Sequence, residues 1–320
     1  MNRRTLLSSA FALPLTLITT PLWAQSDADW PRALTHDTGT LTLDKAPRRV
    51  ISTSPSLTGL LLAIDAPLIA TAATTPGPLT DEIGFFTQWA KIAHARGVES
   101  LYPNRDFDIE ALIMSDPDLV IGSSTGADSL LPYLAEVEAQ GLPTLILDYS
   151  DTSWQALARA LGHATGHEAE AETAIAEFEA KAQNAADRLQ LNGRPVTIVG
   201  YDIAGTYSIG RAESPQAEVL EALDFSITPL PEEFQSAVTR VSNMDFISRE
   251  ALSAAITEDT VILLSADHSD VDAFLNDPLL ANLPAVKKRQ VYPMGLSSFR
   301  VDYYSGLEMI ETLETALSPK

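Results

Sequence analysis

Short apolar runs alternate with amphipathic stretches along most of the chain. Residues 50–53 (VIST) form one such run, which is typical of a buried strand. The turn at residues 54–56 then leads into an apolar helix over residues 57–64, with Ser56 in position to cap it. Because this succession of strand and helix recurs toward the C-terminus, the pattern predicts an α/β fold with parallel-rich sheets.

One long stretch departs from this alternation. Residues 168–191 contain no proline or glycine and are rich in alanine and glutamate, which favours a single long helix. The Asn-Gly-Arg-Pro sequence at residues 192–195 ends it. An apolar stripe follows the predicted helix at three- and four-residue steps: Ile175, Phe178, Ala182, Ala185 and Leu189.

Two parts of the chain resemble each other. Glu-Ala-Leu begins a predicted helix at residues 110–112 and again at 250–252, and each helix leads through an acidic turn into an apolar strand. Self-similar units of this kind predict two lobes that are built alike. The predicted organisation is an N-terminal α/β lobe over residues 25–166, an interlobe helix over 167–192, and a C-terminal α/β lobe over 193–320.

The first 24 residues have the pattern of a secretory signal peptide. Arg3 and Arg4 precede a mostly apolar stretch that ends at the small residue Ala24. The apolar stretch is too short for a permanent anchor, and the arginine pair leaves both the Sec and the twin-arginine routes open. The chain has no cysteine, which excludes disulfides, thiolate metal sites, a cysteine nucleophile and a lipidated cysteine at the cleavage site.

The charge of the chain narrows the classes of partner. There are 43 acidic and 21 basic residues, for a net charge of −22. Removing the signal segment would make it −24, because that segment carries Arg3 and Arg4 and no acidic residue. Nucleic acid is therefore disfavoured as a partner, since its binding needs a basic surface.

A series of short motifs spans almost the whole predicted mature chain. In order they are ADWPR (28–32), STS (52–54), LTG (57–59), LLAIDAP (61–67), ATTP (73–76), QW (88–89), SWQ (153–155), TGHE (165–168), PLLA (278–281), LPAV (283–286), QVY (290–292), FR (299–300) and DYYS (302–305). In order and spread they resemble the class III periplasmic substrate-binding proteins of ABC importers, the siderophore and vitamin B12 type.

This resemblance implies a function as well as a fold. It implies two α/β lobes joined by one helix, with a ligand in the cleft between them, in a periplasmic protein that is not an enzyme and has no cofactor. The implied ligand is a ferric catecholate siderophore, such as enterobactin. The implied partner is an ABC permease in the inner membrane, which takes up the iron chelate from a monomeric binding protein.

The chemistry of such a ligand indicates which residues to look for. A ferric tris-catecholate is anionic, presents flat rings and already coordinates its iron, so the protein needs cations, donors and aromatic faces. Arginine can donate to the oxygens and stack on the rings. We therefore expect Arg300 to be a cation in the cleft, with Phe299 or Tyr303 stacking beside it. The alternative is a helix-capping loop in which Arg300 pairs with Asp302 or another carboxylate.

Further candidates follow from the positions of the predicted strands. Ligands of open α/β sheets lie beyond the carboxyl ends of the strands. At the position that aligns with a tryptophan of catecholate binders in this family, this chain has Gly210. Because that ring is missing, a smaller catecholate or a mixed-ligand siderophore remains a possible ligand. The residues predicted at these edges, in addition to those around Arg300, are Thr53, Ser54, Tyr102, Arg105, Tyr201, Tyr207, Arg211 and Arg240.

Two glutamates are candidates for contact with the permease. Glu110 and Glu250 take equivalent places at the start of the repeated helices. In the family that the chain resembles, glutamates at these positions contact arginines of the permease, one from each lobe. The alternative is that both residues only favour the helix N-terminus, where a negative charge is stabilised.

Other functions remain open at this point. The same fold could bind a hydroxamate siderophore, cobalamin, or haem through Tyr201 or Tyr207. Direct metal binding would use His163 and His167, which are four residues apart. A secreted serine hydrolase is the candidate from a different class, because Ser124 lies between Gly122 and Gly126, and His268 follows in the sequence.

Overall fold

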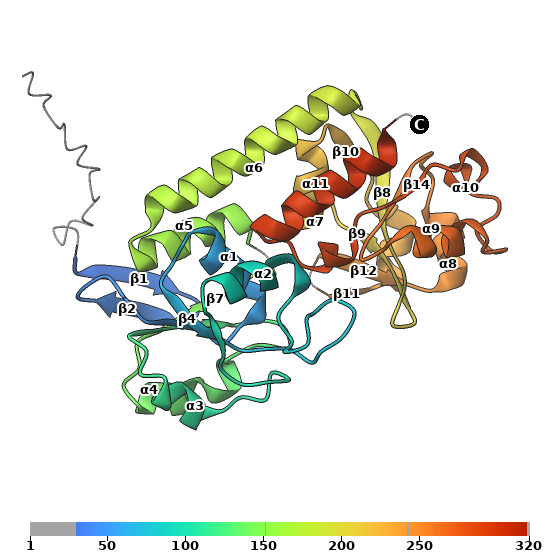
Figure 1. Ribbon diagram of the computed structural model, residues 1–320. Coiled ribbons are helices and arrows are strands. Elements are labelled where there is room, and N and C mark those ends of the chain that lie inside the picture. The colour runs from blue at the N-terminus through green and yellow to red at the C-terminus, as the bar shows by residue number, and fades with distance from the viewer. Residues whose placement is uncertain (1–29, 151, 242, 319–320) are drawn as a thin grey trace, which may run out of the picture.

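The computed structural model describes residues 30–150, 152–241 and 243–318. The predicted signal peptide lies outside these residues. Figure 1 shows two α/β parts, with helix α6 (Glu168–Leu189) running along one side of the molecule from one part toward the other. The predicted α/β class, with parallel-rich sheets and one long helix, is confirmed. Across the described residues, no helix has both the length and the apolar character needed to cross a membrane.

The N-terminal part is built on a five-stranded sheet in the order β5-β4-β3-β6-β7, in which every neighbouring pair is parallel. Strands β3, β6 and β7 are buried at every position, as expected for a parallel sheet covered on both faces. The strands are β3 (Val50–Ser52), β4 (Leu68–Thr71), β5 (Glu99–Ser100), β6 (Leu119–Ser123) and β7 (Thr144–Leu147), preceded by the hairpin β1 (Arg32–His36) and β2 (Gly39–Leu43).

The helices of this part are α1 (Pro55–Ala63), α2 (Thr87–Ala95), α3 (Ile109–Met114), α4 (Leu134–Ala139) and α5 (Trp154–Thr165), with a 3-10 turn η2 (Leu131–Tyr133) before α4. Helix α1 begins two residues earlier than predicted. The expectation that Ser56 caps it is wrong, because Ser54 occupies the cap position and Pro55 begins the helix. Proline suits that place, since the first turn needs no amide donor there.

The C-terminal part has a seven-stranded mixed sheet. Its order is β11-β12-β9-β8-β13-β14, with β10 also paired to β8. Strands β8, β10, β13 and β14 are parallel, whereas β9, β12 and β11 are antiparallel. The strands are β8 (Arg194–Ile203), β9 (Thr206–Gly210), β10 (Phe225–Ile227), β11 (Thr239–Val241), β12 (Met244–Ile247), β13 (Val261–Leu263) and β14 (Val291–Pro293).

The helices of the C-terminal part are α7 (Pro215–Ala222), α8 (Arg249–Ala255), α9 (His268–Leu275), α10 (Pro284–Lys288) and α11 (Tyr303–Leu317), with 3-10 turns η3 (Glu232–Ala237) and η4 (Leu296–Phe299). The repeated Glu-Ala-Leu segments lie on α3 and α8, as predicted. Each leads into a strand of its own sheet, β6 and β13 respectively.

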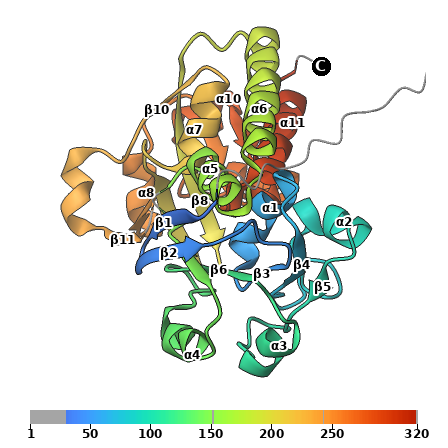
Figure 2. The same ribbon diagram turned by 90° about the vertical axis from the view of Figure 1, so that its left-hand side faces the viewer.

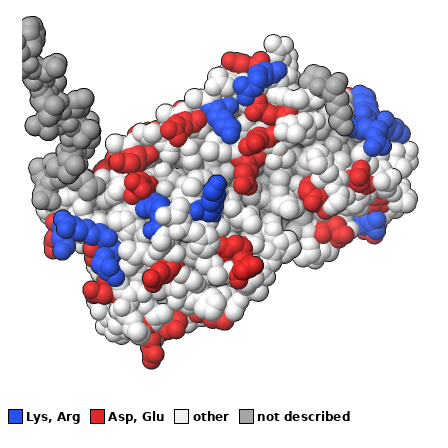
Figure 3. All heavy atoms as spheres, in the orientation of Figure 1, with Lys and Arg blue, Asp and Glu red and all other residues white. Residues whose placement is uncertain are grey.

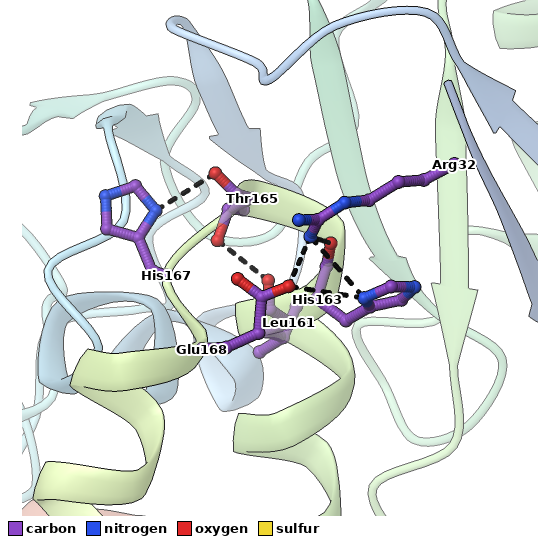
Figure 4. A network of polar contacts seen from close by, with 6 residues as sticks. All are labelled: Arg32, Leu161, His163, Thr165, His167 and Glu168. Atoms are coloured by element: carbon purple, nitrogen blue, oxygen red, sulfur yellow. Dashed lines mark hydrogen bonds and ion pairs between the residues drawn. The ribbon is translucent and has the colours of Figure 1, made fainter. Parts of the chain in front are cut away.

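Helix α6 buries the predicted stripe, apart from the half-buried Leu189. Its start is tied to the N-terminal part by a polar network shown in Figure 4. There the guanidinium of Arg32 on β1 donates to the carboxylate of Glu168 and to the carbonyl oxygen of His163. The first turn of α6 is thereby joined to β1 and to the end of α5.

The C-terminal helix α11 returns to the N-terminal part. It packs against α6 and also contacts α1 and α2 (Figure 2). Two glycines allow this close approach. A Cβ atom on Gly306 would lie 2.8 Å from the ring of Phe178 on α6, and one on Gly59 of α1 would lie 2.4 Å from the carboxylate of Asp302. Helix α11 therefore also joins the two parts.

Asp302 is the N-cap of α11 and is only 3 % exposed. Its carboxylate accepts a hydrogen bond from the amide of Ser305 at 2.8 Å, while its own amide donates to the Ser305 hydroxyl at 2.8 Å. Burial raises the pKa of Asp302 to about 6, against the lowering effect of these cap hydrogen bonds. The negative charge is therefore disfavoured in the folded protein relative to the unfolded chain.

The pKa of Asp302 predicts a specific dependence of stability on pH. The carboxyl group binds its proton more tightly in the folded state. Its contribution to the free energy of unfolding is therefore most favourable below pH 4 and is lost as the pH rises through about 6. A rise from 3.8 to about 6 corresponds to about 3 kcal/mol. We expect Asp302→Asn to remove this fall in the free energy of unfolding, which is measured by urea unfolding at pH 4 and at pH 7.

A matched control is Asp267→Asn, at the exposed N-cap of α9, which also forms a capping box. Hydrogen bonds from Ser269 lower the pKa of Asp267 below its ordinary 3.8, so its contribution to stability changes below pH 4, and the difference between that variant and wild type should stay nearly the same at pH 4 and pH 7. An equal difference between wild type and Asp302→Asn at both pH values would contradict the assignment.

Candidate functional site

A pocket of about 90 Å³ lies between the two parts of the molecule. We refer to it as the interlobe pocket. Residues of the N-terminal part line one side and residues of the C-terminal part line the other. They include Ser56, Tyr149 and Ser150 on the first side, and Gln216, Asn243, Met244, Phe299 and Arg300 on the second.

Arg300 lies in this pocket against an aromatic ring from the opposite side. Its guanidinium carbon is 4.4 Å from the ring centre of Tyr149, and its Nη2 donates to the Tyr149 hydroxyl at 3.3 Å. The carboxylate of Asp302 caps α11, where it accepts from the amide of Ser305, instead of pairing with Arg300. The alternative of a pairing between Arg300 and Asp302 is therefore wrong, and the guanidinium is left facing the pocket.

The backbone around Arg300 is held by the cap of α11. The hydroxyl of Ser305 donates to the carbonyl oxygen of Arg300 at 2.7 Å and accepts from the amide of Asp302. Phe299 also lines the pocket, and its ring packs edge-on against Phe86 at 5.2 Å. One predicted cation and one predicted aromatic residue therefore lie together.

Tyr303 lies elsewhere. Its hydroxyl donates to Glu177 on α6 at 2.9 Å, and its ring packs edge-on against Trp154 and Tyr304. It is the first residue of α11, and the helix directs it toward α6 and away from the interlobe pocket. Of the two predicted aromatic residues, Phe299 therefore lines the interlobe pocket and Tyr303 does not, whereas the ring that lies against the Arg300 guanidinium is that of Tyr149.

A second pocket, of about 190 Å³, lies in the N-terminal part. We refer to it as the N-terminal pocket. It contains the predicted residues Thr53, Tyr102 and Arg105. On its wall the rings of Phe107 and Tyr133 stack almost in parallel, with centres 4.3 Å apart and planes at 12°. The exposed Arg105 thus lies near a flat aromatic surface that the sequence analysis did not anticipate.

Asp128 connects the two pockets. Its two carboxylate oxygens accept hydrogen bonds at 2.5 Å, one from Ser54 and the other from the hydroxyl of Tyr149. Burial raises the pKa of Tyr149 to about 12, and the negative charge of Asp128 adds to that effect, whereas Arg300 opposes it. Tyr149 therefore stays protonated, and it bridges an anion in one pocket and a cation in the other.

The other predicted aromatic residues lie on the long hairpin of β8 and β9. Tyr201 and Tyr207 pack edge-on at 5.6 Å, and the hydroxyl of Tyr201 donates to Asp277 at 2.9 Å. Arg249 donates to the same carboxylate at 2.8 Å. Neither tyrosine lines the interlobe pocket or the N-terminal pocket.

Two predicted arginines have carboxylate partners. Arg211 lies 3.5 Å from Glu213, and Arg240 donates to the buried carboxylate of Asp245 at 2.8 Å. Arg240 belongs to strand β11. Of the four predicted arginines, Arg105 and Arg300 line pockets, whereas Arg211 and Arg240 do not line either one.

Glu110 and Glu250 are both exposed, each at the second position of its helix. Asp108 caps α3 with its carboxylate, and Ser248 caps α8 with its hydroxyl. Other side chains therefore supply the helix caps, and both glutamate carboxylates face solvent.

The sequence model of a known family matches this chain. The matching family is described as periplasmic binding protein, and the match covers residues 50–295. The chain belongs to the periplasmic binding protein family. Membership in this family makes it a binding protein rather than an enzyme, and its compartment the periplasm.

Individual relatives give a more detailed comparison. The chain is 40 % identical to the ferric enterobactin-binding periplasmic protein FepB of Escherichia coli O6:H1 over 308 residues, covering 95 % of this chain and 96 % of the relative. It is 34 % identical to holo-ViuP, with a TM-score of 0.79 over 91 % of this chain and 99 % of that one. The catecholate-siderophore binding protein VctP of Vibrio cholerae shares the fold, with 17 % identity, a TM-score of 0.63, and coverage of 90 % and 99 %.

The residues named for direct metal binding and for hydrolysis are not arranged for these chemistries in this periplasmic binding protein. His163 and His167 do not converge. His167 contacts the carbonyl oxygen of Thr165, whereas His163 lies beside Glu168 (Figure 4). Within the described part of the chain, no group of three or more acidic or histidine side chains could hold a metal ion. The hydroxyl of Ser124 donates to Asp37 rather than to a histidine, which a serine nucleophile needs as its base.

The contact between Arg300 and Tyr149 should be measurable as a coupling between the two parts of the protein. In a double-mutant cycle of unfolding free energies with Arg300→Ala and Tyr149→Leu, we expect a coupling of about 1 kcal/mol, because a cation lies over an aromatic face. Arg300→Ala combined with Tyr133→Leu serves as control and should be additive. Additivity in both cycles would contradict the contact.

Proposed function

We propose that this protein captures a ferric catecholate siderophore, such as ferric enterobactin, and delivers it to an inner-membrane ABC permease. The observation that carries the proposal is Arg300, a cation held in the interlobe pocket of a strongly acidic protein. The similarity to the E. coli ferric enterobactin-binding protein over 95 % of the chain supports the same ligand class.

We also propose the division of the chain into lobes. The N-terminal lobe is assigned to residues 25–166, the interlobe helix to 167–192, and the C-terminal lobe to 193–320.

The residues that line the two pockets suit this ligand. Arg300 and Arg105 can donate to catecholate oxygens, and charge-assisted hydrogen bonds are among the strongest in proteins. Phe299 and the stacked rings of Phe107 and Tyr133 present aromatic faces to catechol rings. The pockets are smaller than an ordinary ligand site of ~300–1,000 Å³, so the siderophore would extend over both.

Asp128 constrains how an anionic ligand can lie there. Its carboxylate repels the ligand, but Ser54 and Tyr149 occupy both oxygens with short hydrogen bonds. The ligand oxygens therefore face Arg300 and Arg105, and the rings face the aromatic side chains. The other predicted arginines and tyrosines would reach the ligand only if their present carboxylate or tyrosine contacts rearranged. These residues are Arg211, Arg240, Tyr201 and Tyr207.

We also propose that residues 1–24 are a signal peptide that directs export to the periplasm through the Sec or the twin-arginine route. Removing this segment would leave a chain that begins at Gln25. Mass spectrometry of protein purified from the periplasm tests the cleavage site. An N-terminus other than Gln25 would contradict it.

Replacing Arg300 tests the ligand assignment. We expect Arg300→Ala to weaken the binding of ferric enterobactin at least ~10-fold, because a charge-assisted hydrogen bond to the ligand is worth ~1.5–3 kcal/mol. The affinity of Arg300→Lys should lie between those of wild type and Arg300→Ala, since lysine keeps the charge but loses the planar donor pair. Quenching of tryptophan fluorescence during titration measures the affinity.

The control variant is Arg159→Ala, which removes an exposed arginine of α5 that pairs with Glu172. It should bind the siderophore like wild type. The wild-type titration also includes a ferric hydroxamate, cobalamin and haem, which the same fold could bind. Wild-type affinity in Arg300→Ala would overturn the role of Arg300, and preference for one of the other ligands would overturn the catecholate assignment.

We propose that Glu110 and Glu250 dock the protein onto the permease. Both carboxylates are exposed, they repeat between the two parts, and other residues cap their helices. Each would pair with a basic side chain at the periplasmic surface of the permease. Two such pairs, one from each lobe, would orient the protein over the entrance of the transport path.

A double variant separates docking from ligand binding. We expect Glu110→Ala/Glu250→Ala to bind ferric enterobactin with unchanged affinity and to support less than about a tenth of wild-type uptake by cells, because both charge pairs are lost. The control is Glu170→Ala/Glu221→Ala, which removes two exposed carboxylates on α6 and α7. Normal uptake by the Glu110/Glu250 variant would contradict the docking role.

A further inference from the structure

Exposed apolar side chains mark one helix of the N-terminal part. Among the described residues, Met114 is the most exposed large hydrophobic side chain, at 85 %, followed by Val241 at 53 %. Its neighbour Ile113 is 44 % exposed. Both lie on α3, which Figure 2 shows with α4 at the lower end of the molecule, far from α6. Scattered single exposed residues need no explanation, but an adjacent pair on one short helix does.

Met114 and Ile113 share a helix face with Glu110. Residues three and four positions apart in an α-helix lie side by side, so the Glu110 carboxylate has Ile113 and Met114 as its neighbours. The opposite face of α3 is anchored by Leu112, which is fully buried. Asp108 holds the start of the helix, with its Oδ1 accepting from the amides of Glu110 and Ala111 at 2.9 and 3.0 Å.

The equivalent helix of the other lobe has no such apolar pair. On α8 the positions three and four residues after Glu250 are Ser253 and Ala254. The hydroxyl of Ser253 donates to the carbonyl oxygen of Glu250 at 3.1 Å. Since the same structural unit forms there with small residues, the fold does not require an isoleucine and a methionine on the exposed face of α3. Their side chains are free to contact a partner.

The surrounding charge indicates the chemistry of that partner. Asp106, Asp108 and Glu110 are all exposed near the start of α3, and the chain carries a net charge of −22. Figure 3 shows acidic side chains at the lower end of the molecule, over α3, whereas basic side chains gather elsewhere, for example over α10. A complementary surface is therefore cationic, with an apolar area beside the cation.

We infer that Ile113 and Met114 form an apolar contact with the permease, beside the ion pair made by Glu110. The inference rests on the proposed docking role of Glu110 and extends it to a second kind of interaction. Apolar side chains around a charge pair exclude water and so strengthen it. Methionine suits such a surface because its flexible thioether adapts to irregular neighbours. The N-terminal lobe thus docks by charge and apolar contact, and the C-terminal lobe by charge alone.

The test is uptake of radioactive ferric enterobactin by cells of the source bacterium that lack their own copy and express each variant. We expect Met114→Ser to reduce uptake about tenfold at limiting expression, with unchanged affinity of the purified protein for ferric enterobactin. Met114→Leu should transport like wild type, because it keeps the apolar side chain. Ile113→Ser should also reduce uptake. Its matched control is Ile83→Ser, because Ile83 is 43 % exposed and lies outside α3.

The outcomes distinguish this inference from the proposals on which it rests. Normal uptake by Met114→Ser together with impaired uptake by Glu110→Ala/Glu250→Ala overturns the apolar contact and leaves the glutamate docking standing. Loss of siderophore affinity in Met114→Ser also overturns it, since the residue would then act on the ligand site. Normal uptake by the glutamate variant, or no uptake by wild type, overturns the proposed function itself and the inference with it.

Discussion

The buried cap of the C-terminal helix determines the geometry of the candidate site. Asp302 reaches between α1 and α11 with almost no exposure, and the reciprocal hydrogen bonds between Asp302 and Ser305 fix the first turn of α11. Ser305 also holds the carbonyl group of Arg300. The arginine therefore enters the interlobe pocket from a loop whose backbone is held by the first turn of α11, next to α1. A carboxyl group with a raised pKa is compatible with this place because its hydrogen bonds compensate in part for burial.

Tyr149 and Asp128 organise the rest of the site around that arginine. The chain of contacts runs from Arg300 through the ring and hydroxyl of Tyr149 to Asp128, and on to Ser54. It joins opposite charges without placing them in direct contact, so the guanidinium keeps donors for a ligand. In a protein of net charge −22, an anionic ligand is repelled at long range. In the proposed function, short-range contacts with Arg300, Arg105 and the aromatic side chains would then supply its affinity.

The proposed docking surface and the two pockets use different residues of the same two lobes. The repeated helices α3 and α8 present one exposed glutamate each, and the proposed docking rests on these two residues. Their surroundings differ, because α3 adds Ile113 and Met114 where α8 has Ser253 and Ala254. The two proposals thus assign ligand capture and docking to separate residues.

The sequence alone determined the α/β class, the long helix with its buried stripe, and the equivalence of Glu110 and Glu250, because these depend on local periodicity and on repetition within the chain. Arg300 and Phe299 could be singled out as a cation beside an aromatic residue in an acidic chain. Tyr149 follows strand β7, and the rule that ligands lie at the carboxyl ends of strands could have found it. Asp128, the Phe107–Tyr133 stack and the turning of Tyr303 toward Glu177 were decided only by the tertiary structure. Each depends on contacts between segments distant in sequence, and no local pattern records which side chains meet there.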